Sequence, residues 1–298
     1  MLPLKQCFLI YSCLLDRFLR PIFVSHLKKM LNGIQFVIAC VCFAISIWLF
    51  KDKSDVQGSF RDIGIGMIVS LTVTGLSKMY ENRVYLRILL QSYIKPHRSV
   101  RVSMAYLFRI KVSGKYLLVR NHRRPETGYQ PVGGVYKYLP NETTTLFNEL
   151  GIENINGIEV DTDSRNDLRC VLSRRVKLPK FISWFNSKKD RETDPWREFY
   201  EELVKENILR HSDFPYIQYI HCKSDYEGIK PSTFFPTDEF LYADIFELKV
   251  ESAAQQRALD ELVTIDSTDF IFATPQEIDN GATATGKVIL PHSKKLLT

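Results

Sequence analysis

Three glutamates near the middle of the chain are spaced for metal-ion chemistry. Glu198, Glu201 and Glu202 follow Asp194, a residue suited to capping a helix, and Pro195, a residue suited to its first turn. In a helix that begins here, residues three and four positions apart share one face, so the three carboxylates crowd together and repel one another. Such a face is stable when water solvates it, when cations pair with it, or when its oxygens hold a hard divalent ion such as Mg²⁺. The spacing therefore indicates either a magnesium site or an acidic surface.

A glycine pair and two groups of basic residues are candidates for binding a phosphate-bearing ligand. At Gly133 and Gly134 the backbone can approach a ligand closely. Arginine binds phosphate strongly, although charge runs are also typical of solvated surface or of protein facing anionic lipid. The first basic group is Arg120, His122, Arg123 and Arg124, and the second is Arg165, Arg169, Arg174 and Arg175. The aromatic residues that could stack on bases, or else pack in the core, are Tyr129, Tyr136, Trp184 and Trp196. His221 and His292 lie in no recognisable pattern, and we expect them to be structural.

The residues from Arg197 to Glu202 resemble the core of the Nudix box. They match its arginine, its first glutamate and its glutamate pair, with the apolar Phe199 in third place. Upstream, LLVRNHRRPETGYQPVGG is similar to the first strands and glycine pair of the same family, and FIFATPQEIDNG is similar to its closing strand and short helix. For an active Nudix enzyme, the resemblance implies glutamates that bind Mg²⁺, which polarises a phosphate and activates water on a nucleoside diphosphate derivative.

Other positions of the box differ from the family's pattern. The glycine and glutamate expected before Arg197 fall on Ser183 and Lys189, and the glycine expected after the glutamate pair falls on Val204. Gly134 and Arg197 also lie about sixty residues apart, which predicts an insertion of roughly fifty residues between them. The resemblance therefore implies a domain that keeps a nucleotide-binding fold, with Arg197 among its ligand contacts, and that has lost turnover.

Two apolar segments precede this domain. Between Lys29 and Lys51, twenty residues carry no ionisable side chain, and a helix of that length matches a bilayer core of roughly 30 Å. A second uncharged stretch covers 63–77. We therefore predict membrane-spanning helices at about 31–50 and 60–80.

The second predicted span carries a stripe of small residues. Gly66, Ser70 and Thr74 recur every four residues, which suits close packing against another helix, either the first span or a second copy of the chain. Basic residues flank the pair of spans, whereas the link between them has no net charge, so we expect both ends of the chain to be cytoplasmic. Residues 1–30 hold only a short apolar run without a cleavage site, which indicates an interfacial helix or an N-terminal extension.

The rest of the chain predicts one mixed domain. A hairpin is expected around Ser113 and Gly114, formed by the apolar stretches SMAYLFRIKV and KYLLVRN. Further strands are expected at 216–222 and 239–250, and helices near 81–94, 196–209 and 252–262. Six cysteines without a CxxC pair predict free thiols rather than a disulfide framework or a zinc site.

The predicted fold class is α+β, with an N-terminal two-helix transmembrane hairpin followed by a divergent Nudix-like α/β/α domain. The predicted boundaries are 1–30 for the N-terminal segment, 31–80 for the spans, 81–100 for a connecting helix and 101–298 for the domain.

Two spans followed by a divergent Nudix domain resemble the SMODS-associated NUDIX proteins of bacterial CBASS anti-phage systems. The resemblance implies an effector in the bacterial inner membrane whose domain binds a cyclic nucleotide second messenger made by a partner synthase. It also implies that the ligand drives homo-oligomerisation and membrane disruption, leading to abortive infection. DNA is not an expected partner, and Mg²⁺ is the one candidate cofactor. The alternatives are a membrane-anchored, Mg²⁺-dependent Nudix pyrophosphohydrolase and a scaffold that binds no small molecule.

Overall fold

The chain divides into two compact units, Met1–Arg83 and Val84–Thr298. A computed structural model describes residues 66, 69–70, 72–121, 125–153, 165–233 and 235–297. In the first unit the described residues up to Glu81 are helical, and the Thr74 hydroxyl donates a hydrogen bond to the Ser70 carbonyl at 2.8 Å. None of the helices in these described ranges has the length and apolar character needed to cross a membrane. The predicted first span, at about 31–50, lies outside the described residues, as does the N-terminal segment.

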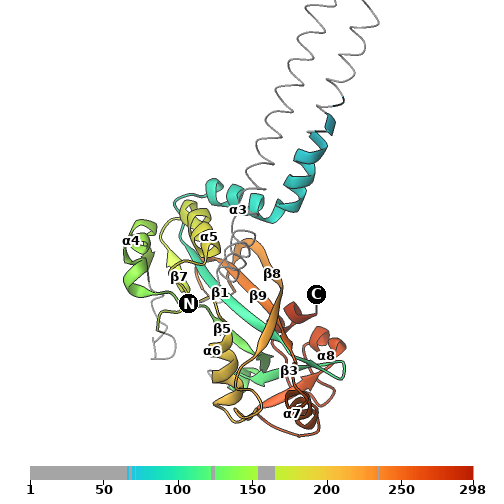
Figure 1. Cartoon of the computed structure of the whole chain (residues 1–298). Coiled ribbons are helices and arrows are strands. Elements are labelled where there is room, and N and C mark those ends of the chain that lie inside the picture. The colour runs from blue at the N-terminus through green and yellow to red at the C-terminus, as the bar shows by residue number, and fades with distance from the viewer. Residues whose placement is uncertain are drawn as a thin grey trace, which may run out of the picture. The chain divides into compact units, whose positions relative to one another are not determined.

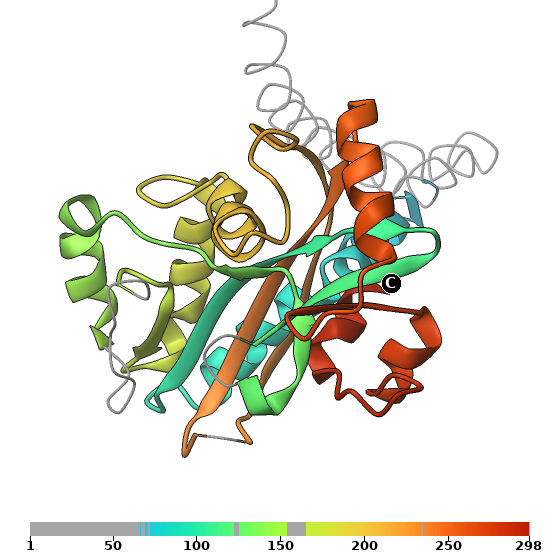
Figure 2. The ribbon, with the colours of Figure 1, turned by 90° about the horizontal axis from the view of Figure 1, so that it is seen from below.

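The second unit is built around a mixed sheet centred on strand β1 (Val100–Arg109). One edge of β1 pairs in parallel with β9 (Asp238–Lys249), which in turn pairs antiparallel with β8 (Gln218–Pro231). Its other edge pairs with β7 (Arg169–Leu172) near the start and with β5 (Gly133–Val135) further along. β6 (Ile152–Glu153) extends the sheet beyond β7. Figure 2 shows β1 and β9 side by side, with helices on both flanks.

A smaller sheet contains the predicted hairpin. β2 (Lys111–Val112) and β3 (Lys115–Arg120) pair around Ser113 and Gly114, and β10 (Phe270–Ala273) and β4 (Tyr129–Pro131) pair with β3. The prediction that the long apolar stretch before the turn pairs with β3 is wrong for most of its length. Ten residues of β1 pair with β9, whereas only two residues of β2 pair with β3. The distant parallel strand therefore provides hydrogen-bond partners for many more backbone groups than the local hairpin does.

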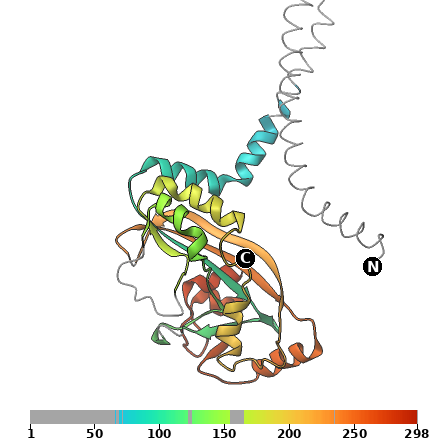
Figure 3. The same ribbon diagram turned by 60° about the vertical axis from the view of Figure 1, so that its left-hand side comes forward.

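Helices cover both faces of the main sheet (Figure 1). Their bounds are α3 Arg83–Ile94, α4 Pro140–Leu150, α5 Leu178–Ser187, α6 Trp196–Phe199, α7 Ala253–Val263 and α8 Pro275–Asn280. Short 3₁₀ turns occur at η1 Pro125–Thr127, η2 Arg175–Lys177 and η4 Pro291–Leu296, and a π-turn, η3, at Tyr200–Val204. Figure 3 shows α3 and α5 alongside each other at one end of the sheet. The predicted helices at 81–94 and 252–262 are confirmed as α3 and α7.

The predicted insertion between Gly134 and Arg197 is structured where it is described. It supplies α4, β6, β7, η2 and α5, and β7 pairs directly with β1. Leu178, Phe181, Ile182 and Phe185 of α5 lie in the main core. The insertion therefore widens the sheet and covers it, and the mixed α+β class is confirmed.

Candidate functional site

The helix that carries the glutamates begins one residue later than predicted. Trp196 is its first residue and Pro195 stands at the N-cap position. Asp194 still contributes, because its carboxylate accepts hydrogen bonds from the Trp196 backbone N–H at 2.9 Å and from the Tyr219 hydroxyl at 3.1 Å. The helix then widens into the π-helical turn η3 and does not reach residue 209. Leu203 and Val204 are buried in this turn, while Glu198 and Glu202 face the glycine pair.

Aromatic packing fixes the opposite face of this helix. The Phe199 ring lies 5.6 Å from Phe108 and 5.8 Å from Phe214 between centroids, and Trp196 stacks on Phe199 at 5.7 Å. Phe199 has no exposed surface. Because aromatic contacts of this kind restrict rotation of the helix, they determine which way the charged side chains point.

Arg197 lies at the centre of the carboxylates. One terminal nitrogen donates to Glu198 at 2.7 Å and to Glu201 at 3.0 Å, while Nε and the other terminal nitrogen donate to the two oxygens of Glu192 at 2.9 and 3.2 Å. The latter nitrogen also donates to the Val135 carbonyl at 3.0 Å. Burial by itself would lower the pKa of Arg197, but its bonds to Glu192 and the attraction of Glu198 raise it, so the guanidinium remains charged.

The glycine pair lies directly against the glutamates. The Gly133 N–H donates to Glu202 at 2.7 Å, and a Cβ atom on Gly134 would overlap the Glu198 carboxylate. A Cβ atom on Gly133 would overlap the Tyr106 carbonyl oxygen, and the φ angle of Gly133, 145°, is one that other residues rarely adopt. Glycine is therefore required here so that β5 can approach both β1 and the carboxylates.

Two of the glutamates are held in surroundings that disfavour their charge. Burial raises the pKa of Glu202 well above its ordinary value, and the nearby Glu198 carboxylate adds to this effect. Burial also raises the pKa of Glu198, although Arg197 opposes the shift. The cluster is therefore more readily protonated than exposed glutamates would be.

The carboxylates as arranged do not fit a resident Mg²⁺ ion. Glu198 and Glu201 both direct an oxygen to the same nitrogen of Arg197, so a guanidinium stands where a shared cation would bind. Glu202 is bonded to the Gly133 backbone, and protonation would make it a poor ligand. Across the described ranges, no group of three or more His, Cys, Asp or Glu side chains is placed to hold a metal ion. Magnesium at these glutamates thus stays a prediction from the sequence.

Comparison with known families places this site in context. The model of the SMODS-associated NUDIX domain matches residues 99–297. The chain belongs to this family. The match begins immediately before β1 and includes both sheets, whereas α3 precedes it. No curated protein and no solved structure gives a significant match.

Glu192 is the residue of this SMODS-associated NUDIX domain that sequence reasoning missed. It binds Arg197 through both carboxylate oxygens and accepts the Lys137 backbone N–H at 3.1 Å. Counting by the Nudix spacing pointed instead to Lys189, which is exposed. Glu192 stands five residues before Arg197, so a search for the nearest upstream glutamate would have found it.

The first group of predicted basic residues does not join this cluster in the part of the chain that the structure describes. Arg120 donates to the Pro125 carbonyl of its own loop at 3.2 Å, and Arg123 and Arg124 lie outside the described residues. In the second group, Arg175 is buried and paired with Asp238, and Arg174 contacts His97 at 3.3 Å. Of the predicted ligand contacts, Gly133, Gly134 and Arg197 are therefore the ones gathered at the glutamates.

A second polar cluster lies on the same sheet. Asp244 of β9 accepts hydrogen bonds from Tyr136 and Tyr242 at 2.7 Å, from Ser224 at 2.5 Å and from His221 at 3.0 Å. Burial, together with Asp244, raises the pKa of Tyr136, so this phenol stays a neutral donor. In the strand register, Tyr106 of β1 lies between Asp244 and Gly134. The two clusters therefore lie at the same register on the strands that flank β1.

Proposed function

We propose that this chain is the effector of a bacterial CBASS antiviral system, and that its NUDIX domain binds a cyclic nucleotide second messenger without cleaving it. Membership of the SMODS-associated NUDIX family over residues 99–297 supports the antiviral context. The observation that carries the choice of receptor over hydrolase is the position of Arg197, which uses the glutamates that a Nudix enzyme would offer to magnesium.

The chemistry of the box favours retention of a ligand. Phosphate hydrolysis in this type of site depends on a hard cation that polarises the phosphate and activates water. Glu198 and Glu201 instead neutralise a guanidinium, and burial of Glu202 favours its uncharged form. The loss of hydrolysis suits a receptor, because a messenger that is not hydrolysed remains bound.

The N-terminal unit is proposed to act on the membrane. The described part of its helix exposes apolar residues at Val69, Val73, Leu76, Met79 and Tyr80, and the small residues Gly66, Ser70 and Thr74 are exposed as well. Exposed apolar side chains on a helix suit contact with lipid or with another helix. In this proposal the inner membrane holds the spans, both termini are cytoplasmic, and ligand binding clusters several copies until the bilayer is disrupted.

The test uses the full chain in liposomes that contain a fluorescent dye. Cyclic di- and trinucleotides are added one at a time, and binding, crosslinked oligomers and dye release are measured together. We expect one of them to bind, to increase the crosslinked species and to release dye. A Gly66→Leu variant, which would block close helix contact, is expected to bind the nucleotide but release less dye. Absence of binding and of release with every nucleotide would refute the proposal.

The alternative hydrolase makes a different prediction in the same preparation. With magnesium and nucleoside diphosphate derivatives, it would release phosphate or nucleoside monophosphate, and Glu202→Gln would abolish that release. The receptor proposal expects no such release from the wild-type chain.

A further inference from the structure

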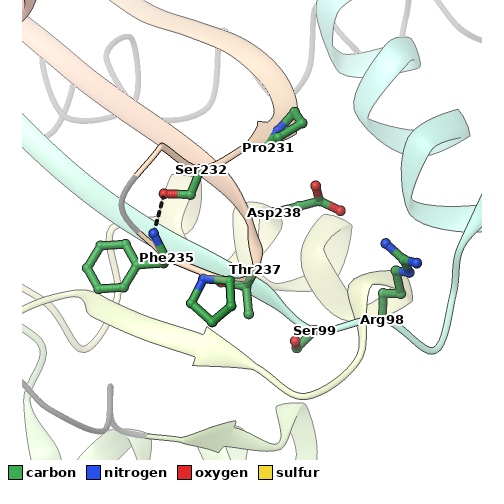
Figure 4. Close-up of a pocket in the computed structure, with 8 residues that line it drawn as sticks. Arg98, Ser99, Pro231, Ser232, Phe235, Thr237 and Asp238 are labelled. Carbon is green, nitrogen blue, oxygen red and sulfur yellow. Dashed lines mark hydrogen bonds between the residues drawn. The ribbon is translucent and has the colours of Figure 1, made fainter.

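A cavity lies at the other end of β1 from the smaller sheet. Its volume is about 520 Å³, within the range of small-molecule sites. The residues that line it come from the entry to β1 and from the β8–β9 turn: Arg98, Ser99, Pro231, Ser232, Phe235, Pro236, Thr237 and Asp238. Figure 4 shows Phe235 and Arg98 on opposite sides of this cavity, with Thr237 and Asp238 between them.

The carboxylate in the wall is already neutralised. Asp238 forms an ion pair with Arg175, whose side chain is only 6% exposed. A buried guanidinium has few alternatives, so this pair holds Asp238 firmly and removes its negative charge from the balance of the cavity. The wall is therefore unsuited to a cation and does not repel an anion.

Arg98 supplies a positive charge that is not used by its neighbours. Its side chain is exposed, and among the described residues it makes no ion pair and no side-chain hydrogen bond. An arginine at the edge of a cavity can bind a phosphate through two parallel hydrogen bonds. The hydroxyls of Ser99 and Thr237 line the same cavity and are suitable additional donors.

Phe235 supplies an aromatic surface that is held in place. The Arg101 guanidinium lies 4.5 Å from the centre of its ring, and Arg101 is itself fixed by Glu239 at 3.1 Å. The Phe235 backbone N–H also donates to the Ser232 hydroxyl at 3.2 Å. A ring restrained in this way is ready to stack on a planar heterocycle.

The cavity also adjoins the helix that leads to the N-terminal unit. Arg98 follows α3 by four residues, and its carbonyl accepts the Arg175 N–H at 2.7 Å. On α3 itself, the Gln91 side chain both accepts from and donates to the Ile229 backbone of β8, at 2.9 and 3.0 Å. A ligand in the cavity would thus touch the two segments that anchor α3.

We propose that this cavity is the nucleotide site of the protein, with Arg98 binding a phosphate and Phe235 stacking on a base. The identification of the ligand as a cyclic nucleotide rests on the proposed function, whereas the recognition of an anionic ligand with a planar ring rests on the cavity itself. Because Arg98 follows α3 and Pro231 follows Ile229, which Gln91 of α3 binds, a ligand in the cavity would contact residues next to those that hold α3.

Calorimetry on the full chain in detergent tests the proposal. Cyclic dinucleotides, cyclic trinucleotides and linear nucleoside monophosphates are titrated into the wild type and into Arg98→Ala, Phe235→Ala and the milder Phe235→Leu. We expect each of the first two variants to weaken binding by about tenfold or more. Arg257→Ala, which removes an exposed arginine from α7, is the matched charge control, and Arg120→Ala tests the region predicted from sequence; both should bind as the wild type does.

Each outcome decides between the two proposals. Unchanged cyclic-nucleotide binding by all the Arg98 and Phe235 variants would overturn the cavity site and leave the proposed function intact. Binding of linear nucleotides alone, with the expected losses in these variants, would support the cavity site and overturn the proposed function. If no nucleotide binds to the wild type, both fail. Thermal unfolding of each variant identifies any loss of binding that is due to misfolding. Arg98→Ala changes an exposed side chain and is therefore the variant with the smallest expected effect on folding.

Discussion

The carboxylate cluster around Arg197 and the cavity beside Arg98 belong to the same compact unit but use their charges in opposite ways. At the cluster, one guanidinium is shared among Glu192, Glu198 and Glu201. At the cavity, Asp238 is paired with a different arginine, and Arg98 remains unpaired among the described residues. The guanidinium nitrogens of Arg197 are all engaged within the chain, whereas those of Arg98 are available to a ligand.

This difference determines which region can bind a ligand without breaking existing interactions. Carboxylates hold the Arg197 guanidinium, so a ligand must break these bonds before it can bind there, at a cost of several kcal/mol for a buried pair. An unpaired arginine at the edge of a cavity makes no such demand. The box that resembles an active site is therefore the weaker candidate for ligand binding, and the cavity, which has no recognisable motif, is the stronger one.

The largest expected effect is on stability, from Arg197→Ala. This change leaves three partly buried carboxylates facing one another, and we expect it to lower the free energy of unfolding by about 3 kcal/mol or more. Arg98→Ala should change it by less than about 0.5 kcal/mol, because an exposed, unpaired side chain is lost. Chemical denaturation followed by tryptophan fluorescence measures both. Equal effects of the two changes would remove the distinction between the regions.

The glycine pair gives the next largest effect and tests how tightly the cluster is packed. Gly133→Ala places a Cβ atom against the Tyr106 backbone at an unfavourable φ angle, so we expect a loss of about 2 kcal/mol. In Gly134→Ala the nearest atoms to the new Cβ are those of the Glu198 carboxylate, which can move if it releases Arg197, so the expected loss is about 1 kcal/mol. Thermal denaturation of the two variants side by side gives the order. If Gly134→Ala were the more damaging, the carboxylate would be more rigid than its bonding suggests.

Much of this fold could be predicted from local pattern. The strand predicted at 239–250 is β9, and the helices predicted at 81–94 and 252–262 are α3 and α7. The pairing of β1 was wrong, because a Ser-Gly turn signals a local hairpin and nothing in the local sequence signals a parallel partner more than a hundred residues away. Similarly, the RExxEE pattern located Arg197 and its glutamates, but fixed motif spacing passed over Glu192.

The cavity could not be found in this way. Arg175 was noted only as part of a basic run, and its neutralising partner Asp238 lies some sixty residues away. Arg98 and Phe235 belong to no pattern, and the fold alone brings them together. Charge that remains unpaired is a property of the folded chain, because it depends on which carboxylates the sheet brings within reach.

A smaller effect is expected from Glu202→Gln, which removes a buried charge but keeps an acceptor for the Gly133 N–H. A raised carboxyl pKa means that the folded protein binds this proton more tightly than the unfolded chain does, so the cost of the charge is present above the folded pKa and disappears as the pH falls. The variant should therefore be more stable than the wild type by about 1 kcal/mol at pH values near 8.

That difference should narrow as the pH falls toward about 5. His292 has the opposite effect on the pH dependence of stability. Burial and the nearby Lys295 lower its pKa to about 4, so the folded protein loses stability as the pH falls from 6.5, the ordinary pKa of histidine, toward 4. His292 contributes equally to both proteins, so its contribution cancels when the free energy of unfolding of the wild type is subtracted from that of the variant at each pH. A variant that is less stable than the wild type at high pH would show that the Glu202 charge is favourable in the cluster.

The smallest expected effect is that of magnesium on the wild-type protein, and it sharpens the comparison most. Because Arg197 already occupies the position between Glu198 and Glu201, millimolar Mg²⁺ should raise the midpoint of thermal unfolding by less than about 1 °C. Arg197→Ala should respond more strongly, since the same carboxylates then face one another without a cation and can share a hard divalent ion. Sodium chloride of equal ionic strength controls for simple screening. A large magnesium response of the wild type, lost in Glu202→Gln, would mean that the ion displaces Arg197, and the cluster would then be a metal site held closed by its own arginine.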